Sequence, residues 1–275
     1  MPELLDLTPR FQTFYALAQH QTPGDRWALW REHYGFAAVP PTPEGQAAAR
    51  RLLDGAWDRY ATLPAALDGE VQRLSQQASA ASRRLEALFG TGTPPYRLVT
   101  FVGDFQGNAF VAGDSLCMPV EMPASWAAPI LTHELTHLFH HSLSGGAGEW
   151  RRPLAALIVE EGLACRTVAA LHPEVALDLQ VGEPSWLQAC ERHQAELLAD
   201  ARSLLASDDD ETLLRFLQPH PTLGLERTAY ALGWWLVGAW LARGNTLAEL
   251  ARVPAAELPA LVGHWLDQWL EQGPQ

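Results

Sequence analysis

The pattern of hydrophobic and polar positions in this 275-residue chain predicts helices over most of its length. Before residue 91 a helical period is found in residues 11–19, 26–35, 45–63 and 70–90. Between residues 96 and 122 short β-branched and aromatic runs are separated by Gly-Asp and Gly-Asn turns, which predicts three strands. Every later segment is again helical in pattern. We therefore expect an α+β protein that is mostly helical, with a small mixed or antiparallel sheet.

The segment LTHELTHLFHH, residues 131–141, gathers imidazoles on one face of a predicted helix. Successive residues of an α-helix are rotated by about 100° around its axis. His133, Glu134 and His137 therefore share one arc with two further histidines, His140 and His141. Leucine and phenylalanine fill the opposite arc, which is the face expected to meet the core.

His133 and His137 have the spacing of two metal ligands. Residues four apart lie on adjacent helical turns, roughly 6 Å from each other, so two imidazole nitrogens can reach one Zn²⁺ ion. Glu134 lies beside them, where it can act as general base on a zinc-bound water. This is the H-E-x-x-H arrangement of zinc peptidases.

A third ligand is expected from the helix predicted between Pro153 and Pro173. Glu161 lies in the centre of an apolar stripe on that helix, where a carboxylate needs a compensating cation. Glu160 points about 100° away and is the weaker candidate. The alternative interpretation of Glu161 is an ordinary salt-bridge or helix-end glutamate. Gly162 beside it would allow this helix to approach the histidine helix closely.

These motifs resemble those of the gluzincin metallopeptidases. H-E-x-x-H followed by E-G-L-A is similar to a bacterial family of predicted zinc-dependent proteases, and the resemblance covers roughly residues 98 to 252. It implies that Glu161 is the third zinc ligand. It also implies a third helix around Tyr230, although Ala229 replaces the glycine that precedes the tyrosine in that family. Cys165 stands where the thermolysin-like pattern has an acidic residue, so the carboxylate that orients a ligand histidine has to come from elsewhere.

The resemblance also implies a zincin-like arrangement, in which the sheet adjoins the active-site helix and a helical C-terminal lobe follows. The expected domains are an N-terminal helical region at 1–92, the sheet with the active-site helix at 93–148, and the helical lobe at 149–275. Residues 93–275 would together form the catalytic domain. In such enzymes a strand beside the cleft pairs with an extended peptide substrate, and residues 115–122 are the candidate for that strand.

A donor to the negative charge that develops on the substrate oxygen is expected from the helix at 226–243. Tyr230 and Arg227 are the two candidates, and the family resemblance favours Tyr230. Gly233, one turn further on, would let the helix approach the site. The alternative is that Tyr230 is a core residue with a satisfied hydroxyl. His140 could line the cleft, bind substrate or replace Glu161 as a ligand.

Composition narrows the class of partner. A formal net charge of −13 argues against nucleic acid and anionic membranes. The N-terminus lacks the basic and apolar regions of a signal peptide, and the apolar run at 230–242 is too short to span a bilayer. Three widely spaced cysteines indicate reduced thiols, so a cytoplasmic protein is expected.

The function expected from these residues is a zinc-dependent peptidase that hydrolyses peptide bonds by a Glu134-activated, zinc-bound water. Its partner would be a peptide or protein substrate in extended conformation. Two alternatives stay open at this point: a noncatalytic, metal-stabilised peptide-binding module, and a zinc hydrolase acting on a nonpeptide bond. A purely structural metal site needs the ligands but has no need of Glu134. The sequence leaves the oligomeric state open.

Overall fold

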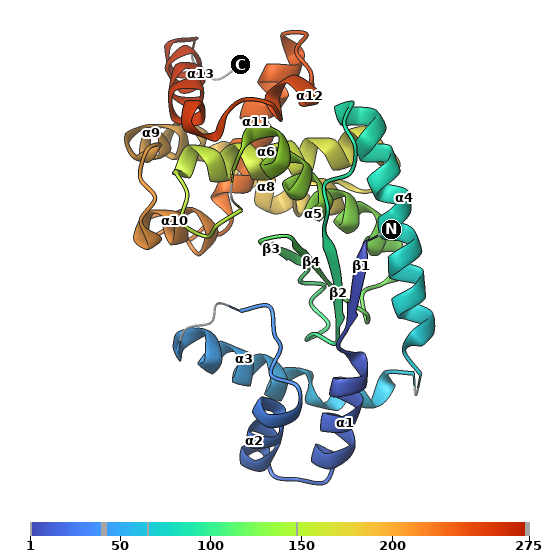
Figure 1. The fold of residues 1–275 in the computed structure, drawn as a ribbon. Helices are drawn as coiled ribbons and strands as arrows, with labels where there is room; N and C mark the ends of the chain where they lie inside the picture. The colour runs from blue at the N-terminus through green and yellow to red at the C-terminus, as the bar shows by residue number, and fades with distance from the viewer. Residues whose placement is uncertain (1, 40–42, 65, 147, 273–275) are drawn as a thin grey trace. The chain divides into compact units, whose positions relative to one another are not determined.

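The computed structural model describes residues 2–39, 43–64, 66–146 and 148–272, and it folds into two compact units (Figure 1). The first unit comprises the described residues up to Ala81 together with Pro95–Leu131. The second comprises Ser82–Pro94 and the described residues from Thr132 onward. Two long helices, α4 (Asp68–Phe89) and α5 (Ala124–Ser144), have residues in both units. The domain boundaries expected at 92/93 and 148/149 stay predictions.

The first unit contains a four-stranded mixed sheet in the order β1-β2-β4-β3. The strands are β1 (Glu3–Asp6), β2 (Arg97–Phe101), β3 (Phe110–Ala112) and β4 (Ser115–Pro119). β2 is parallel to both β1 and β4, whereas β3 is antiparallel to β4. The three strands expected between residues 96 and 122 are therefore present. β1 was not expected, because its four residues show no alternation of polar and apolar positions. Its two leucines are exposed in the structure.

β4 is an inner strand of this sheet, which corrects one expectation. It pairs with β2 along its whole length and with β3 over Ser115–Cys117. Its backbone groups there are already used in the ladder, so that part of residues 115–122 cannot accept an extended peptide by strand addition. Among the described strands, the edges of the sheet are β1 and β3.

The N-terminal helices of the first unit match the expected segments. They are α1 (Thr8–Ala18), α2 (Pro23–His33), α3 (Pro43–Ala56) and the 3₁₀ helix η1 (Trp57–Thr62). Their aromatic residues pack edge to face, with ring centroids 5.4 Å apart for Phe11 and Tyr34 and 4.9 Å for Phe11 and Tyr60. The Tyr34 hydroxyl accepts from the N–H of Val102 and donates to its carbonyl, which ties α2 to the end of β2.

The second unit is helical, and α6 (Leu154–Leu171) is its central element. The other helices are α7 (Leu177–Gln180), α8 (Pro184–Arg192), α9 (Gln194–Leu204), α10 (Asp210–Leu217), α11 (Thr228–Ala242), α12 (Leu247–Leu250), η2 (Ala255–Glu257) and α13 (Leu258–Gln272). α6 packs against α11, α13, α10 and α12. It is buried on all sides rather than along one stripe, so both Glu160 and Glu161 are inside the protein.

The start of α6 is held by the chain that follows α9. The N–H groups of Leu154 and Ala155 lack partners within the helix and donate instead to the carbonyls of Ser207 and Leu205. Pro153 precedes the first helical residue. The helix is thus fixed at its N-terminal end, about two turns before Glu161.

α6 and α11 touch backbone to backbone at two glycines. A Cβ atom added to Gly162 would lie 2.4 Å from the carbonyl oxygen of Gly233, and one added to Gly233 would lie 2.4 Å from the carbonyl oxygen of Ile158. The expectation that Gly162 permits a close approach to the histidine helix is wrong in its partner, because Gly162 faces α11. The expected close approach of α11 through Gly233 is present.

Candidate metal centre

His133, Glu134 and His137 lie on one face of α5. The imidazole rings of His133 and His137 have centroids 5.0 Å apart and are inclined by 77°. The four-residue spacing places them on adjacent turns, as expected. His137 is buried, whereas His133 and Glu134 are half-buried.

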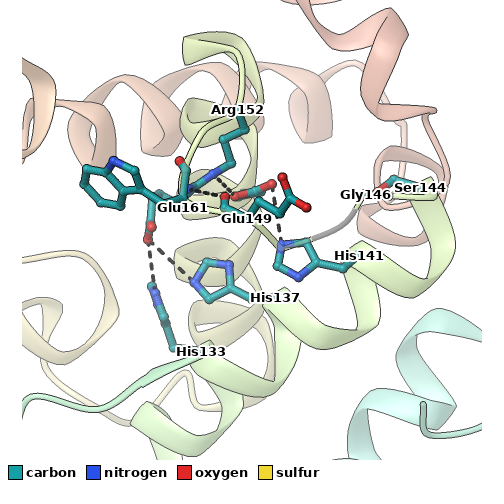
Figure 2. A network of polar contacts seen from close by, with 10 residues as sticks. His133, His137, His141, Ser144, Gly146, Glu149, Arg152 and Glu161 are labelled. Carbon is teal, nitrogen blue, oxygen red and sulfur yellow. Dashed lines mark hydrogen bonds and ion pairs between the residues drawn. The ribbon is translucent and has the colours of Figure 1, made fainter. Parts of the chain in front are cut away.

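α6 brings Glu161 to these two histidines (Figure 2). Oε2 of Glu161 lies 3.2 Å from Nε2 of His133 and 3.8 Å from Nε2 of His137. One ligand atom from each of the three residues falls within 4.8 Å of the others, so this buried group could hold a metal ion. These are the three residues that the sequence predicts as ligands.

The protonation of the three side chains is set by burial and by their mutual contacts. Burial lowers the pKa of His137 to about 3, so its imidazole is neutral and has a lone pair to donate. Burial opposes ionisation of Glu161, but His137, His133 and Arg152 outweigh it and lower the pKa to about 2. Burial also opposes protonation of His133, yet contacts with Cys165 and Glu161 raise its pKa overall. The group therefore combines an ionised carboxylate, a neutral imidazole at His137 and an imidazole at His133 that a bound metal ion would have to deprotonate. Imidazole and carboxylate ligands are a donor set that suits Zn²⁺.

Glu134 lies next to His133 but is not part of the ligand group. Burial, reinforced by the negative charge of Glu161, raises the pKa of its carboxyl to about 7, while His133 and Arg227 oppose the shift. A carboxyl with this pKa exchanges a proton readily near neutral pH.

Glu160 belongs to a separate network beside the ligand group, which Figure 2 also shows through the labelled Arg152, Glu149 and His141. Its Oε2 lies 2.6 Å from Nε of Arg152, and its Oε1 lies 3.5 Å from Nε2 of His141. Arg152 also donates to the carbonyls of Glu149 and Trp150. The charge of Glu160 is thus balanced by arginine, which leaves Glu161 as the glutamate of α6 that faces both His133 and His137.

His140 and His141 lie outside the ligand group. His140 is 1 % exposed, and neither of its ring nitrogens has a hydrogen-bond partner among the described residues. Burial lowers its pKa to about 4, so the ring is neutral at physiological pH. His141 is half-buried and faces Glu160 rather than solvent alone, which the sequence did not indicate.

α11 adds an aromatic ring to the first histidine. The ring of Tyr230 stacks on that of His133 with centroids 6.1 Å apart and an angle of 8° between the planes. The guanidinium carbon of Arg227 lies 4.0 Å from the centroid of the Tyr230 ring. The Gly162–Gly233 contact is what allows α11 to lie this close to α6.

Sequence reasoning missed Arg152 and did not define the surroundings of Cys165. Arg152 precedes the predicted helix and carries no pattern that relates it to Glu160. Cys165 is one turn after Glu161 on α6, is 1 % exposed, and contacts His133, where the thermolysin-like pattern has a carboxylate. The one feature of the sequence that could have placed Cys165 near the ligand group is its position four residues after Glu161, on the next helical turn.

Comparison of the chain with protein-family models, with curated proteins and with solved structures yields no match. The gluzincin resemblance and the zincin-like arrangement therefore stay predictions that rest on the motifs and on the site geometry. Within the described ranges, no helix combines the length and the apolar character that crossing a membrane requires. The cytoplasmic location also stays a prediction.

Proposed function

We propose that this protein is a zinc-dependent peptidase whose metal ligands are His133, His137 and Glu161. The observation that carries the proposal is the convergence of two imidazole nitrogens and one carboxylate oxygen within 4.8 Å, with the carboxyl of Glu134 beside them. Three protein ligands of this kind leave one position for a water or a substrate, as catalytic zinc sites do. A bound zinc would supply a Lewis acid that acidifies water and polarises a carbonyl group.

Glu134 is the general base in this proposal. Its pKa of about 7 allows it to take a proton from the attacking water and to pass that proton to the leaving amine. A half-buried carboxyl that ligates nothing and loses part of its hydration is unfavourable for folding. A site that only stabilises the fold has no use for it, so Glu134 favours an enzyme over a metal-stabilised binding module.

Tyr230 is the proposed donor to the developing oxyanion. Burial and the charge of Glu161 raise its pKa well above the ordinary value, so the phenol stays protonated and can donate a hydrogen bond. Its ring packs against both His133 and Arg227. This packing restricts the phenol to few orientations, which is what a preorganised donor needs.

The first test is metal content. The purified protein should contain about one zinc per chain, and His137→Ala should lose most of it because a two-ligand site binds zinc weakly. His140→Ala is the matched control, since it removes a neighbouring buried imidazole that is outside the ligand group. Elemental analysis of the three proteins decides the assignment. Full zinc occupancy in His137→Ala would refute it.

The second test is hydrolysis itself. The zinc-loaded protein should cleave members of a mixed peptide library, detected by mass spectrometry of the products. Removal of the metal with a chelator should stop cleavage, and zinc should restore it. Bound zinc without any cleavage across the library would argue for a noncatalytic module or a nonpeptide substrate.

Tyr230→Phe tests the oxyanion donor. Loss of one such donor lowers kcat by about 10²–10³-fold in enzymes of this kind. We expect a loss of that order on any peptide found in the library, with zinc content and thermal stability unchanged, because the ring and its stacking on His133 remain. Steady-state kinetics on the matched pair measures it. A wild-type kcat would leave Tyr230 as a packing residue.

A further inference from the structure

Arg227 occupies a strained position at the start of α11. Its backbone is left-handed, with φ 55° and ψ 33°, and it is one of only two non-glycine residues with positive φ in the described part of the chain. Glycine or asparagine adopts this conformation more easily than arginine. The strain is held in place by the N–H of Arg227, which donates to the carbonyl of Leu217, and by its own carbonyl, which accepts from Tyr230. An arginine kept in such a conformation indicates that its side chain is needed there.

The side chain of Arg227 is directed over the Tyr230 ring, and that ring is stacked on His133. The guanidinium of Arg227 and the imidazole of His133 thus both pack against the Tyr230 ring, which links Arg227 to a proposed metal ligand. Arg227 itself is exposed, so a solute can reach it from outside. The guanidinium also makes a side-chain hydrogen bond to Tyr230. Its remaining N–H groups can donate to another acceptor.

The charge of Arg227 has no carboxylate within ion-pair distance among the described residues. Glu134 and Glu161 are near enough for electrostatic interaction, but neither forms an ion pair with it. Some exposed arginines of the second unit are paired, as Arg151 is with Asp210 and Arg202 with Asp267, whereas others such as Arg243 form no ion pair among the described residues. The first turn of α11 also lacks acidic residues. A permanently charged guanidinium that forms no ion pair with a described carboxylate is suited to bind an external anion.

We propose that Arg227 binds a carboxylate of the substrate close to the scissile bond, so that the preferred substrates are peptides with such a carboxylate. This inference rests on the proposed peptidase function. The carboxylate has two sources: the free C-terminus of a peptide, or an acidic side chain next to the cleaved bond. Planar, bidentate hydrogen bonding of guanidinium to carboxylate provides the recognition. If Arg227 instead donated a hydrogen bond to the substrate carbonyl, its removal would lower the affinity for all peptides equally.

The test measures binding without turnover. Zinc-loaded Glu134→Gln protein is titrated by calorimetry with three capped tripeptides: acetyl-trialanine as the free acid, the same peptide as the amide, and an amide with glutamate in the last position. We expect the free acid or the glutamate peptide to bind at least tenfold more tightly than the trialanine amide. Which of the two binds more tightly identifies the source of the carboxylate.

The same titrations are repeated with Arg227→Gln added to the protein. The preference should disappear, while affinity for the amide stays within about twofold, because only the charged contact is removed. A carboxylate preference that survives Arg227→Gln would mean that the carboxylate binds the metal or another group, and it would overturn the proposal. Equal loss of affinity for all three peptides would assign Arg227 to the carbonyl and overturn it as well.

A second variant, Arg227→Gly, checks that a lost preference does not come from misfolding. Arg227→Gly removes the strained side chain, so its thermal midpoint should equal or exceed that of the parent protein while the preference is lost. Failure of the peptidase proposal has a different signature, namely bound zinc in the parent protein without cleavage of any peptide in the library. The binding preference for carboxylate is read separately from that outcome.

Discussion

Glu134→Gln is expected to abolish peptide hydrolysis while the protein keeps its zinc. The amide has nearly the same size as the carboxyl but cannot accept a proton, so the attacking water is no longer deprotonated. General bases contribute about 10²–10⁴-fold to rates, and we expect a loss at or above the upper end of that range. The zinc content should not change because Glu134 is outside the ligand group. Measuring kcat/KM and elemental zinc on the same preparation tests both statements.

Glu134→Asp is the graded control for this experiment. It keeps the basic carboxylate but withdraws it by one methylene, so its rate should lie between those of the parent and Glu134→Gln. Undiminished cleavage by Glu134→Gln that still stops with a chelator would show that another group is the base. Cleavage that also survives the chelator would come from a contaminating protease.

Gly233→Ala is expected to have the largest effect on stability. The added methyl group would lie 2.4 Å from the carbonyl oxygen of Ile158 and 2.6 Å from the backbone nitrogen of Gly162. Backbone atoms of two helices cannot move aside as a flexible side chain can. Overpacking commonly lowers the free energy of unfolding by about 1–3 kcal/mol and occasionally by more. We expect at least the upper value here, measured by urea unfolding.

Separation of α6 and α11 should also reach the metal centre, because α6 carries Glu161 and α11 carries Tyr230. Zinc affinity of Gly233→Ala is therefore expected to fall along with stability. Gly263→Ala is the matched control in the same unit: its new methyl group would find its nearest neighbour, Leu205 Cδ1, at 3.6 Å. It should stabilise α13 by about 0.5–1 kcal/mol, since alanine favours a helix interior over glycine. Equal stability of the two variants would contradict the close packing of Gly162 and Gly233.

Much of the metal centre could be read from local spacing. His133 and His137 share a helix, and the period of a helix alone decides that their side chains meet. Glu161 was identifiable because a carboxylate amid apolar residues needs compensation. The choice of Glu161 over Glu160 was harder. Both are buried, and their difference lies in Arg152, which balances Glu160 from a segment without a recognisable pattern.

In the sheet, too, the strands were predictable from local sequence, whereas their order was not. Alternation and turn residues predicted the strands in Arg97–Phe101, Phe110–Ala112 and Ser115–Pro119, but strand order depends on contacts between distant segments. β4 proved to be an inner strand, and β1 joined the sheet although its own residues do not alternate. Pairing with β2 supplies the hydrogen bonds that make Glu3–Asp6 a strand.

The helical periods, the strand segments between residues 96 and 122, and the candidate ligands His133, His137 and Glu161 could all be predicted from the amino-acid sequence. Each depends on local periodicity or on the chemistry of one residue type. Tertiary structure alone decided that Gly162 meets Gly233, that Tyr230 stacks on His133 and that Arg227 adopts a left-handed backbone. The first two features arise where segments about 70 to 100 residues apart come into contact, and the backbone of Arg227 is fixed by its hydrogen bond to Leu217 at the start of α11. Such contacts follow from the packing of whole helices and leave no periodic trace in the chain.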